Sequence, residues 1–251
     1  MSEGPQVKLR TQWLARHLQG RRADRILTER QDLSATAEQL AGQTVARCYC
    51  KGKHIFIEIG PDWVLHNHLL MRGKWRMAKG PFLFIPTQYW LVIESGSSAI
   101  CNINGQVLEF ITHQQAEDIT KRLGPDILAD PYPREEVIAK LKVQRKPISE
   151  AILDQAVIAG IGNVAKSEAL FLAEIDPRVP ANTVTNDALV RLSDAMRQVM
   201  QESLEQGGRW IHRVYQRHRE PCHTCSTRIA VIRMPPSKRS TYFCPKCQRK
   251  H

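Results

Sequence analysis

The stretch "CHTCSTRIAVIRMPPSKRSTYFCPKC" (residues 222–247) determines how this 251-residue chain ends. It contains two C-x2-C pairs with eighteen residues between them, a spacing typical of four-thiolate zinc sites. Each pair can hold one edge of a tetrahedral ion, and the residues between the pairs can form a β-hairpin. Two disulfides are the alternative, but a reducing compartment disfavours them. We therefore predict one structural zinc ion, because four thiolates leave no open coordination position; the ligands are Cys222, Cys225, Cys244 and Cys247.

Basic residues are concentrated around this cysteine module. The formal net charge is +11, and residues 207–251 hold 11 Lys and Arg but a single acid. A solvated basic tail is the simplest explanation, yet Trp210 and Tyr242 lie in the same stretch, which is therefore not of low complexity. A folded basic module favours a polyanionic partner. Lys238 and Arg239 lie near the tip of the expected hairpin, where they can bind phosphates without reading a base sequence.

Upstream of this module the apolar residues recur with helical spacing. Four segments are amphipathic: residues 135–143, 149–160, 163–175 and 186–208. The turn "GIGN" (160–163) lies between two of them, and its glycines let the backbone approach a ligand closely. Asn163 is a natural N-cap for the next helix, whose free N–H groups can bind a phosphate. A plain connection between helices is the alternative.

The first half of the chain has a different pattern. Residues 6–19 predict an amphipathic helix, with Pro5 in its first turn and Gly20 just past its end. Residues 46–110 contain short β-rich runs separated by Gly and Pro, at spacings that suit an antiparallel sandwich or barrel. Three prolines and several acids interrupt both patterns in residues 123–135, which we expect to be a linker.

We therefore predict an α+β fold in four parts: an N-terminal helix with an antiparallel β-sandwich (1–122), a linker (123–135), a helical domain (136–215) and a zinc finger (216–251). No run approaches the roughly 20 apolar residues of a membrane span, and no secretion signal is evident, so we expect a cytoplasmic protein without a membrane partner. Three further cysteines, Cys48, Cys50 and Cys101, are most simply buried thiols on strands.

Seven motifs occur in the order seen in a known enzyme family. They are "SEGP" (2–5), "KGKHIFIE" (51–58), "LLMRGKWR" (69–76), "LGPD" (123–126), "GIGNVAKSEALF" (160–171), "REPCHTC" (219–225) and "SKRSTYFCPKCQ" (237–248). Over essentially its whole length the chain resembles the formamidopyrimidine-DNA glycosylase and endonuclease VIII family. The resemblance implies a helix–two-turn–helix in the helical domain and a monomeric enzyme of base excision repair. Such an enzyme flips a damaged base out of duplex DNA, cuts its glycosidic bond and often nicks the strand at the abasic site.

The resemblance assigns the chemistry to Ser2 and Glu3. In the family, the α-amine of the residue after the initiator methionine attacks C1′ of the sugar to form a Schiff base, and the following glutamate is a general acid and base. An α-amine has a reference pKa of about 7.7–8.0 against about 10.4 for lysine, so much more of it is unprotonated at neutral pH. The chemistry requires removal of Met1, which a small second residue permits.

Six further residues are expected to contact DNA, and four of them match family positions. Lys53 would contact phosphate and assist the reaction, although a solvated turn charge is the alternative. Asn163 would hold a phosphate beside the lesion, and Arg239 would bind the phosphates at the abasic site. Met71 would fill the hole left by the flipped nucleotide, although a methionine in a β-rich run is usually in the core. His68 and Lys238 complete the expected DNA contacts.

The sequence departs from the family pattern in two ways. Most members carry proline where this chain has Ser2, and a primary amine gives an imine that must be protonated to act as an electron sink, so we expect weaker strand nicking. The arginine and phenylalanine wedge of enzymes that act on oxidised purines is absent from residues 99–110, and the stretch before the zinc module leaves little room for a long lesion-capping loop. Both features favour the endonuclease VIII side of the family, with oxidised pyrimidines or abasic sites as substrates.

Two other functions are compatible with parts of the sequence. A catalytically weakened paralogue would bind damaged or abasic DNA through Lys53, Asn163, Arg239 and the zinc hairpin without excising a base efficiently. A zinc-ribbon transcription factor would leave the first half of the chain unexplained. Retention of Glu3 together with Lys53 and Arg239 favours the enzyme.

Overall fold

The computed structural model describes residues 2–105 and 107–249 and divides into two compact units. One, the β-sandwich unit, holds Val7–Lys121 together with Ser2. The other, the helical unit, holds Glu3–Gln6 and the chain from Arg122 onward. The start of the first helix is therefore part of the helical unit, although the residues that follow it belong to the sandwich.

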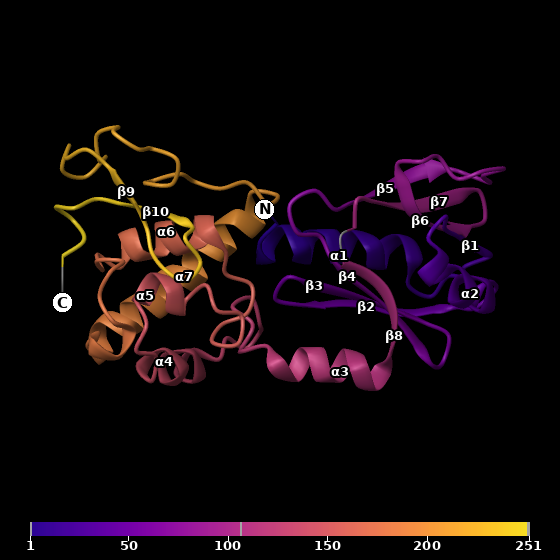
Figure 1. Ribbon diagram of the computed structural model, residues 1–251, viewed down its shortest axis with the longest axis horizontal. Helices are drawn as coiled ribbons and strands as arrows, with labels where there is room; N and C mark the ends of the chain where they lie inside the picture. The colour runs from indigo at the N-terminus through magenta and orange to yellow at the C-terminus, as the bar shows by residue number, and fades with distance from the viewer. Residues whose placement is uncertain (1, 106, 250–251) are drawn as a thin grey trace. The chain divides into compact units, whose positions relative to one another are not determined.

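The β-sandwich unit contains two four-stranded antiparallel sheets, as predicted (Figure 1). One sheet has the strand order β1-β6-β7-β5 and the other β2-β3-β4-β8. The strands are β1 (Arg25–Leu27), β2 (Val45–Lys51), β3 (His54–Ile59), β4 (Trp63–His68), β5 (Lys74–Lys79), β6 (Tyr89–Ser95), β7 (Ser98–Ile103) and β8 (Val107–Thr112). Three helices accompany them: α1 (Gly4–Leu18), α2 (Gln31–Leu40) and α3 (His113–Arg122).

Both faces of the second sheet are buried. Along β3, Ile55, Ile57 and Ile59 are fully buried and join the core of the sandwich. Phe56 points to the opposite face, where it packs in a separate cluster with Ala116 of α3. The alternation of side chains along a strand therefore explains why "HIFIEI" is apolar at almost every position: alternate residues enter two different cores.

Helix α1 supplies one stripe to the sandwich core. Val7, Leu14 and Leu18 are at most 1% exposed and recur at the spacing of one helical face. The helix begins two residues earlier than predicted, and Gly20, at φ +76°, ends it in the left-handed conformation that glycine adopts without steric cost.

The helical unit surrounds an apolar core to which all of its helices and the segments between them contribute. Its helices are α4 (Arg134–Lys142), α5 (Ile148–Ala151), α6 (Asn163–Leu172), the 3-10 turn η1 (Ala181–Thr183) and α7 (Asn186–Glu205). Leu170 on α6 and Leu189, Leu192 and Met196 on α7 are fully buried. Thr185 caps α7 through its side chain, which accepts a hydrogen bond from the backbone N–H of Ala188.

The helix expected over residues 149–160 is much shorter than predicted. Only α5 is helical, because side chains that follow it bind the backbone in competition with helical hydrogen bonds. Asp154 accepts from the N–H of Ala156, and Gln155 accepts from the N–H of Gly160. Two successive turns therefore connect α5 to α6. The segment expected as a linker is packed rather than solvated, since Ile127 and Leu128 enter the core of the helical unit.

The C-terminal module is a zinc-finger hairpin. Strands β9 (Ala230–Arg233) and β10 (Ser240–Phe243) pair antiparallel, as the spacing of the cysteines predicted. The ligand atoms of the four cysteines lie within 4.8 Å of one another. Among the described residues the apolar cluster of this module is small, so a bound metal would contribute much of its stability. Within the described ranges, no helix has both the length and the apolar character needed to cross a bilayer.

Candidate active site

Glu3 lies at the N-terminus of α6, 1% exposed. Its carboxylate accepts backbone N–H groups from Gly162 (3.0 Å), Val164 (2.8 Å) and Ala165 (3.2 Å). These are the unpaired donors that the first turn of a helix leaves available, and the positive end of the helix dipole favours the negative charge. Glu3 is therefore fixed in place by the helix that the sequence predicted as a phosphate site.

This arrangement corrects the predicted role of Asn163 as the N-cap of the helix. Gly162 occupies the N-cap position, and Asn163 is the first helical residue. The N–H groups expected to bind a phosphate donate instead to Glu3. The prediction failed because the capping group comes from a residue 159 positions away in the chain.

The two glycines of the turn allow this close approach. A Cβ atom on Gly162 would lie 2.4 Å from the carboxyl carbon of Glu3. Gly160, at φ +103°, accepts the N–H of Gly4 through its carbonyl oxygen at 3.0 Å. The turn therefore binds the chain's own N-terminal segment, and any side chain at residue 162 would displace Glu3.

Asn163 is joined to the zinc hairpin and to a buried lysine. Its Nδ2 donates to the carbonyl oxygen of Ser240 at 2.8 Å, and its Oδ1 accepts from Lys166 Nζ at 2.8 Å. Lys166 is fully buried and was not among the predicted site residues. The only signal in the sequence was a lysine within the apolar run that follows "GIGN".

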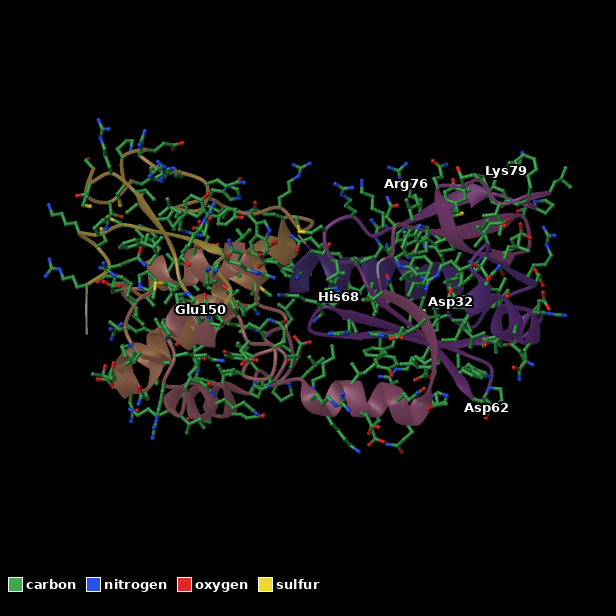
Figure 2. All side chains as sticks on the ribbon, in the orientation of Figure 1. Asp32, Asp62, His68, Arg76, Lys79 and Glu150 are labelled. Atoms are coloured by element: carbon green, nitrogen blue, oxygen red, sulfur yellow. The ribbon has the colours of Figure 1, made fainter. Side chains whose placement is uncertain are left out.

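The hairpin loop that carries Lys238 and Arg239 is anchored by Glu150, which is 4% exposed. The two carboxylate oxygens of Glu150 accept from the hydroxyl (2.8 Å) and the backbone N–H (3.1 Å) of Ser237. The hydroxyl of Ser237 in turn accepts the backbone N–H of Arg239 at 3.2 Å. Lys238 and Arg239 are exposed on this loop, and Figure 2 labels Glu150 on α5.

In the β-sandwich unit, Ser2 lies beside the segment that carries Met71. The backbone nitrogen of Ser2 donates to the carbonyl oxygen of Leu70 at 3.1 Å. Met1 lies outside the described residues. Met71 is 68% exposed, which excludes the core position that methionines in β-rich runs usually take. The predicted role of Met71 at the flipped nucleotide stays a prediction.

Lys53 belongs to a cluster of buried basic groups in the same unit. It is 6% exposed, so it is not a solvated turn charge. Burial lowers the pKa of His54 to about 3, assisted by the neighbouring imidazoles and by Lys53. Burial and the Lys53 charge lower the pKa of His68, labelled at the end of β4 in Figure 2, to about 4. Both imidazoles are therefore neutral at physiological pH.

A hydrogen-bonded chain continues from His54 across the sheet. His54 Nδ1 lies 2.9 Å from His66 Nε2, and His66 Nδ1 lies 2.9 Å from an oxygen of Glu109. Burial lowers the pKa of His66, although the hydrogen bond and charge of Glu109 oppose this shift. His54 and His66 were not predicted as site residues. Their spacing on two strands gave no signal until the register of β3 and β4, which pairs His54 with His68 and Phe56 with His66, made His54 and His66 diagonal neighbours.

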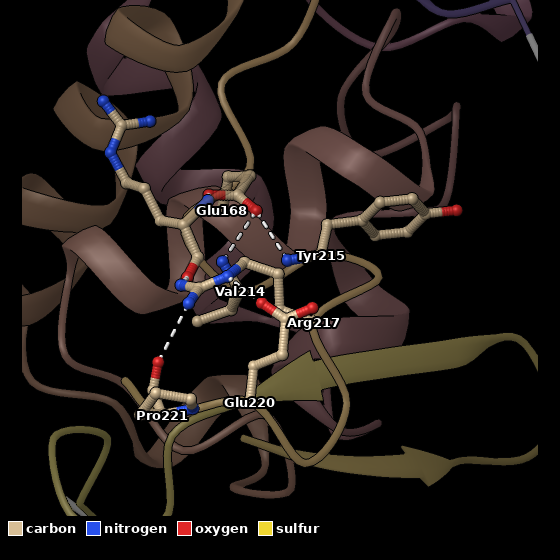
Figure 3. A network of polar contacts seen from close by, with 7 residues as sticks. Glu168, Val214, Tyr215, Arg217, Glu220 and Pro221 are labelled. Carbon is tan, nitrogen blue, oxygen red and sulfur yellow. Dashed lines mark hydrogen bonds and ion pairs between the residues drawn. The ribbon is translucent and has the colours of Figure 1, made fainter. Parts of the chain in front are cut away.

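A second buried carboxylate, Glu168, lies within α6. It accepts the backbone N–H groups of Arg213, Val214 and Tyr215 at 2.7–3.1 Å (Figure 3). Burial raises the pKa of Glu168, and the three hydrogen bonds only partly offset that effect. Glu168 therefore holds the segment that leads into the zinc module against α6.

Three family models match successive parts of the chain. Residues 1–111 match the formamidopyrimidine-DNA glycosylase N-terminal domain, residues 123–214 its H2TH domain, and residues 219–249 the zinc finger found in FPG and IleRS. The formamidopyrimidine-DNA glycosylase of Erythrobacter litoralis is 30% identical over 275 residues, an alignment that covers 99% of this chain and all of the relative.

The chain belongs to the formamidopyrimidine-DNA glycosylase family. Endonuclease 8 2 of Mycobacterium tuberculosis is also 30% identical, over 99% of this chain and the whole relative. Among solved structures, MutM in complex with DNA containing carbocyclic 8-oxo-G has a TM-score of 0.87 at 25% identity, covering 99% of this chain and 100% of that one. Lactococcus lactis Fpg in complex with DNA that contains an oxidised pyrimidine gives the same TM-score, identity and coverage.

Family membership confirms the predicted fold, enzyme class and cofactor. The matching domain and the curated relatives bear the names of a DNA glycosylase and of endonuclease 8, which is the predicted enzyme class. The zinc-finger match and the cluster of four cysteines confirm one structural zinc ion. Hydrogen bonds to Thr227 lower the pKa of Cys225 to about 6, whereas burial raises the pKa values of Cys244 and Cys247, and bound zinc would favour the thiolate form of all its ligands.

Proposed function

We propose that this glycosylase excises oxidised pyrimidines and cleaves abasic sites in damaged duplex DNA, with the α-amine of Ser2 as nucleophile and Glu3 as general acid and base. The observation that supports it is the position of the Glu3 carboxylate, held by three amides and covalently adjacent to Ser2. A carboxylate with no freedom to turn away is suited to hand protons to one fixed point.

Ser2 precedes the first residue of α1 by two positions. The positive end of the helix dipole disfavours a protonated amine there, so the nucleophilic form is favoured. Attack of the amine on C1′ would break the bond from C1′ to the base, which leaves with the bonding electrons. The ring would then open as the bond from C1′ to the ring oxygen breaks, the ring oxygen gains a proton and the amine loses one, and the resulting Schiff base would need a proton to promote elimination. We expect Glu3 to exchange that proton and to protonate the ring oxygen.

The other predicted residues would bind the DNA. Asn163, Lys238 and Arg239 would contact phosphates, Lys53 and His68 would contact the backbone near the lesion, and Met71 would fill the space left by the flipped nucleotide. Phosphate contacts of this kind position the duplex without reading its sequence. The four cysteines would hold zinc so that the hairpin keeps its shape. We expect a monomer that acts on the nucleoid in the cytoplasm.

The test combines lesion-containing oligonucleotides with borohydride, which reduces a Schiff base to a stable adduct. We expect trapping on abasic duplexes and on oxidised pyrimidines, with less on oxidised purines. Ser2→Pro is the matched variant and should raise the ratio of nicking to excision. Intact mass should show the loss of one methionine. Binding without any adduct or cleavage would indicate the weakened paralogue, which the serine at residue 2 makes the second candidate.

A further inference from the structure

The ammonium group of Lys166 is buried at a point where the described structure gives it three oxygen acceptors. Lys166 is 0% exposed, on a helix whose neighbouring residues Ala165, Ala169 and Leu170 are in the apolar core. Taking a charge out of water is costly unless it is paired by good hydrogen bonds. A lysine retained in this position therefore requires specific partners, and their identity indicates what it does.

The three acceptors link the asparagine of α6 to the zinc hairpin. Lys166 Nζ donates to Asn163 Oδ1 at 2.8 Å, to Thr241 Oγ1 at 2.7 Å and to the carbonyl oxygen of Ser240 at 3.5 Å. Thr241 and Ser240 lie at the start of β10, directly after Arg239. One side chain therefore holds the first turn of α6 and the base of the hairpin loop together.

These contacts also decide which way the Asn163 amide points. An ammonium group has only donors, so the side of the amide that faces Lys166 must be its oxygen. On the other side the carbonyl oxygen of Ser240 can only accept, so the amide nitrogen must face it, at 2.8 Å. The amide uses one N–H there, and its second N–H is left for another acceptor.

The charged groups around Lys166 come from three parts of the helical unit. Burial lowers the pKa of Lys166 to about 8, and the positive charge of Arg239 lowers it too, whereas Glu150 on α5 and Glu3 at the N-terminus raise it. Lys166 itself is on α6, and β10 contributes the neutral Thr241. Most of the lysine is therefore charged at neutral pH, and a modest rise in pH removes the charge.

We propose that Lys166 is a positioning residue, which orients the Asn163 amide toward a DNA phosphate and fixes it to the hairpin that carries Arg239. The proposal rests on the proposed function in one respect, namely that a phosphate of the substrate lies at Asn163 and Arg239. Lys166 does not touch the DNA in this role. It ensures that two phosphate contacts from separate parts of the helical unit are assembled before the DNA arrives.

Phosphate binding and protonation of Lys166 should be linked. A bound phosphate adds negative charge nearby and raises the pKa of Lys166 above about 8, so DNA favours the protonated form. Affinity should then be constant below the pKa of the free protein. It should fall as pH rises from about 8 toward the higher pKa of the complex.

The experiment is a double-mutant cycle on the zinc-loaded, full-length protein. Wild type, Lys166→Met, Asn163→Ala and the double variant are titrated with a duplex that carries a stable abasic-site analogue. We expect Lys166→Met to weaken binding about tenfold or more, the size expected for a charged hydrogen bond. In the Asn163→Ala background the same change should alter the Kd less than about twofold, because coupled residues are not additive.

Further variants separate positioning from general stability. Lys166→Arg keeps the donors and should restore most of the affinity while removing the loss of binding above pH 8. Thr241→Val removes one acceptor of Lys166. It should weaken DNA binding less than Lys166→Met does, and this loss should also depend on the presence of Asn163. Lys146→Met is the matched control, because Lys146 pairs with Asp154 and makes no contact with Asn163 in the described structure. Thermal unfolding and zinc content identify any variant that fails to fold.

The outcomes distinguish this proposal from the proposed function. Equal losses from Lys166→Met with and without Asn163, or no loss at all, would overturn it. If Lys166→Met does not fold, the same comparison is made with Lys166→Arg and Thr241→Val, each measured with and without Asn163→Ala. A wild-type protein that binds the abasic duplex but excises nothing would overturn the proposed enzyme function. The double-mutant cycle, which measures binding alone, would still test the role of Lys166. A wild-type protein that does not bind DNA would overturn both.

Discussion

Glu3 and Glu168 are two buried carboxylates of the helical unit, each accepting three backbone N–H groups at closely similar distances. The donors to Glu3 are the first-turn amides of α6, and its neighbour in the chain is the proposed nucleophile. The donors to Glu168 are three consecutive residues of the segment that enters the zinc module (Figure 3). Burial and complete hydrogen bonding are therefore not signs of catalysis. The group beside the carboxylate decides whether it does chemistry or holds two segments together.

Replacing Glu3 gives the largest contrast. Glu3→Gln removes the proton donor and turns an NH2 group toward at least one of the amides that hold Glu3, so we expect excision and nicking to fall about 100-fold or more, the range for loss of a general acid or base. Single-turnover cleavage of a lesion duplex measures this. Glu168→Gln is the matched variant and should retain activity per folded molecule. Equal losses of activity in the two variants would contradict the contrast.

Displacing Glu3 without changing it tests whether its position matters. A Cβ on Gly162 would overlap the Glu3 carboxyl carbon at 2.4 Å, whereas the backbone there, at φ −126°, is allowed for alanine. We expect Gly162→Ala to lower the single-turnover rate, on the order of tenfold to a hundredfold, because small misplacements of catalytic groups are costly. Gly80→Ala, whose Cβ makes only ordinary contacts, is the control. An unchanged rate would mean that the backbone around Glu3 can shift to accommodate a side chain at residue 162 without loss of activity.

For Glu168 the expected effect is on stability. Glu168→Gln replaces one carboxylate oxygen with an NH2 group, so at least one of the three amide donors faces another donor, which should cost about 1–3 kcal/mol. Hydrogen exchange at the Val214 and Tyr215 amides measures the local opening that follows. Glu3→Gln should leave exchange at those two amides unchanged. Protection that is equal in wild type and Glu168→Gln would show that another contact holds this segment.

The comparison of buried carboxylates extends to His54 and His68 of the sandwich, whose imidazoles lose their charge in the folded protein. The pKa values of His54 and His68 fall to about 3 and about 4, below the reference value of 6.5. Protonation therefore favours the unfolded chain, and stability should be lost as pH falls below 6.5 toward those values. Each histidine accounts for about 1.4 kcal/mol at pH 5.5. His54→Gln should reduce the loss on acid titration followed by circular dichroism, whereas His113→Gln on exposed α3 should not.

Local patterns were enough to predict much of this molecule. The cysteine spacing, the alternation in residues 46–110 and the periodicity of α7 each depend on neighbours in sequence, and the structure contains the hairpin, the sandwich and the helix they predict. The motifs that resemble the family made Glu3 and Asn163 candidate site residues, and their roles stay predictions. They could not give the partners of those side chains.

The predictions that failed depend on distant or competing contacts. Asn163 has the chemistry of an N-cap, but Glu3 supplies the capping oxygens and moves the cap to Gly162. Residues 149–160 have helical periodicity, but Asp154 and Gln155 bind the backbone instead. Lys166 escaped notice because its acceptors Ser240 and Thr241 lie more than 70 positions away.

The binding site for Glu3, formed by three amides of α6, cannot be complete early in protein synthesis. The amide donors are made about 160 residues after Glu3 itself, so this binding site does not exist while the ribosome produces the first half of the chain. An incomplete polypeptide that lacks α6 therefore cannot yet hold Glu3 in place beside Ser2, even where the sandwich residues have already been made.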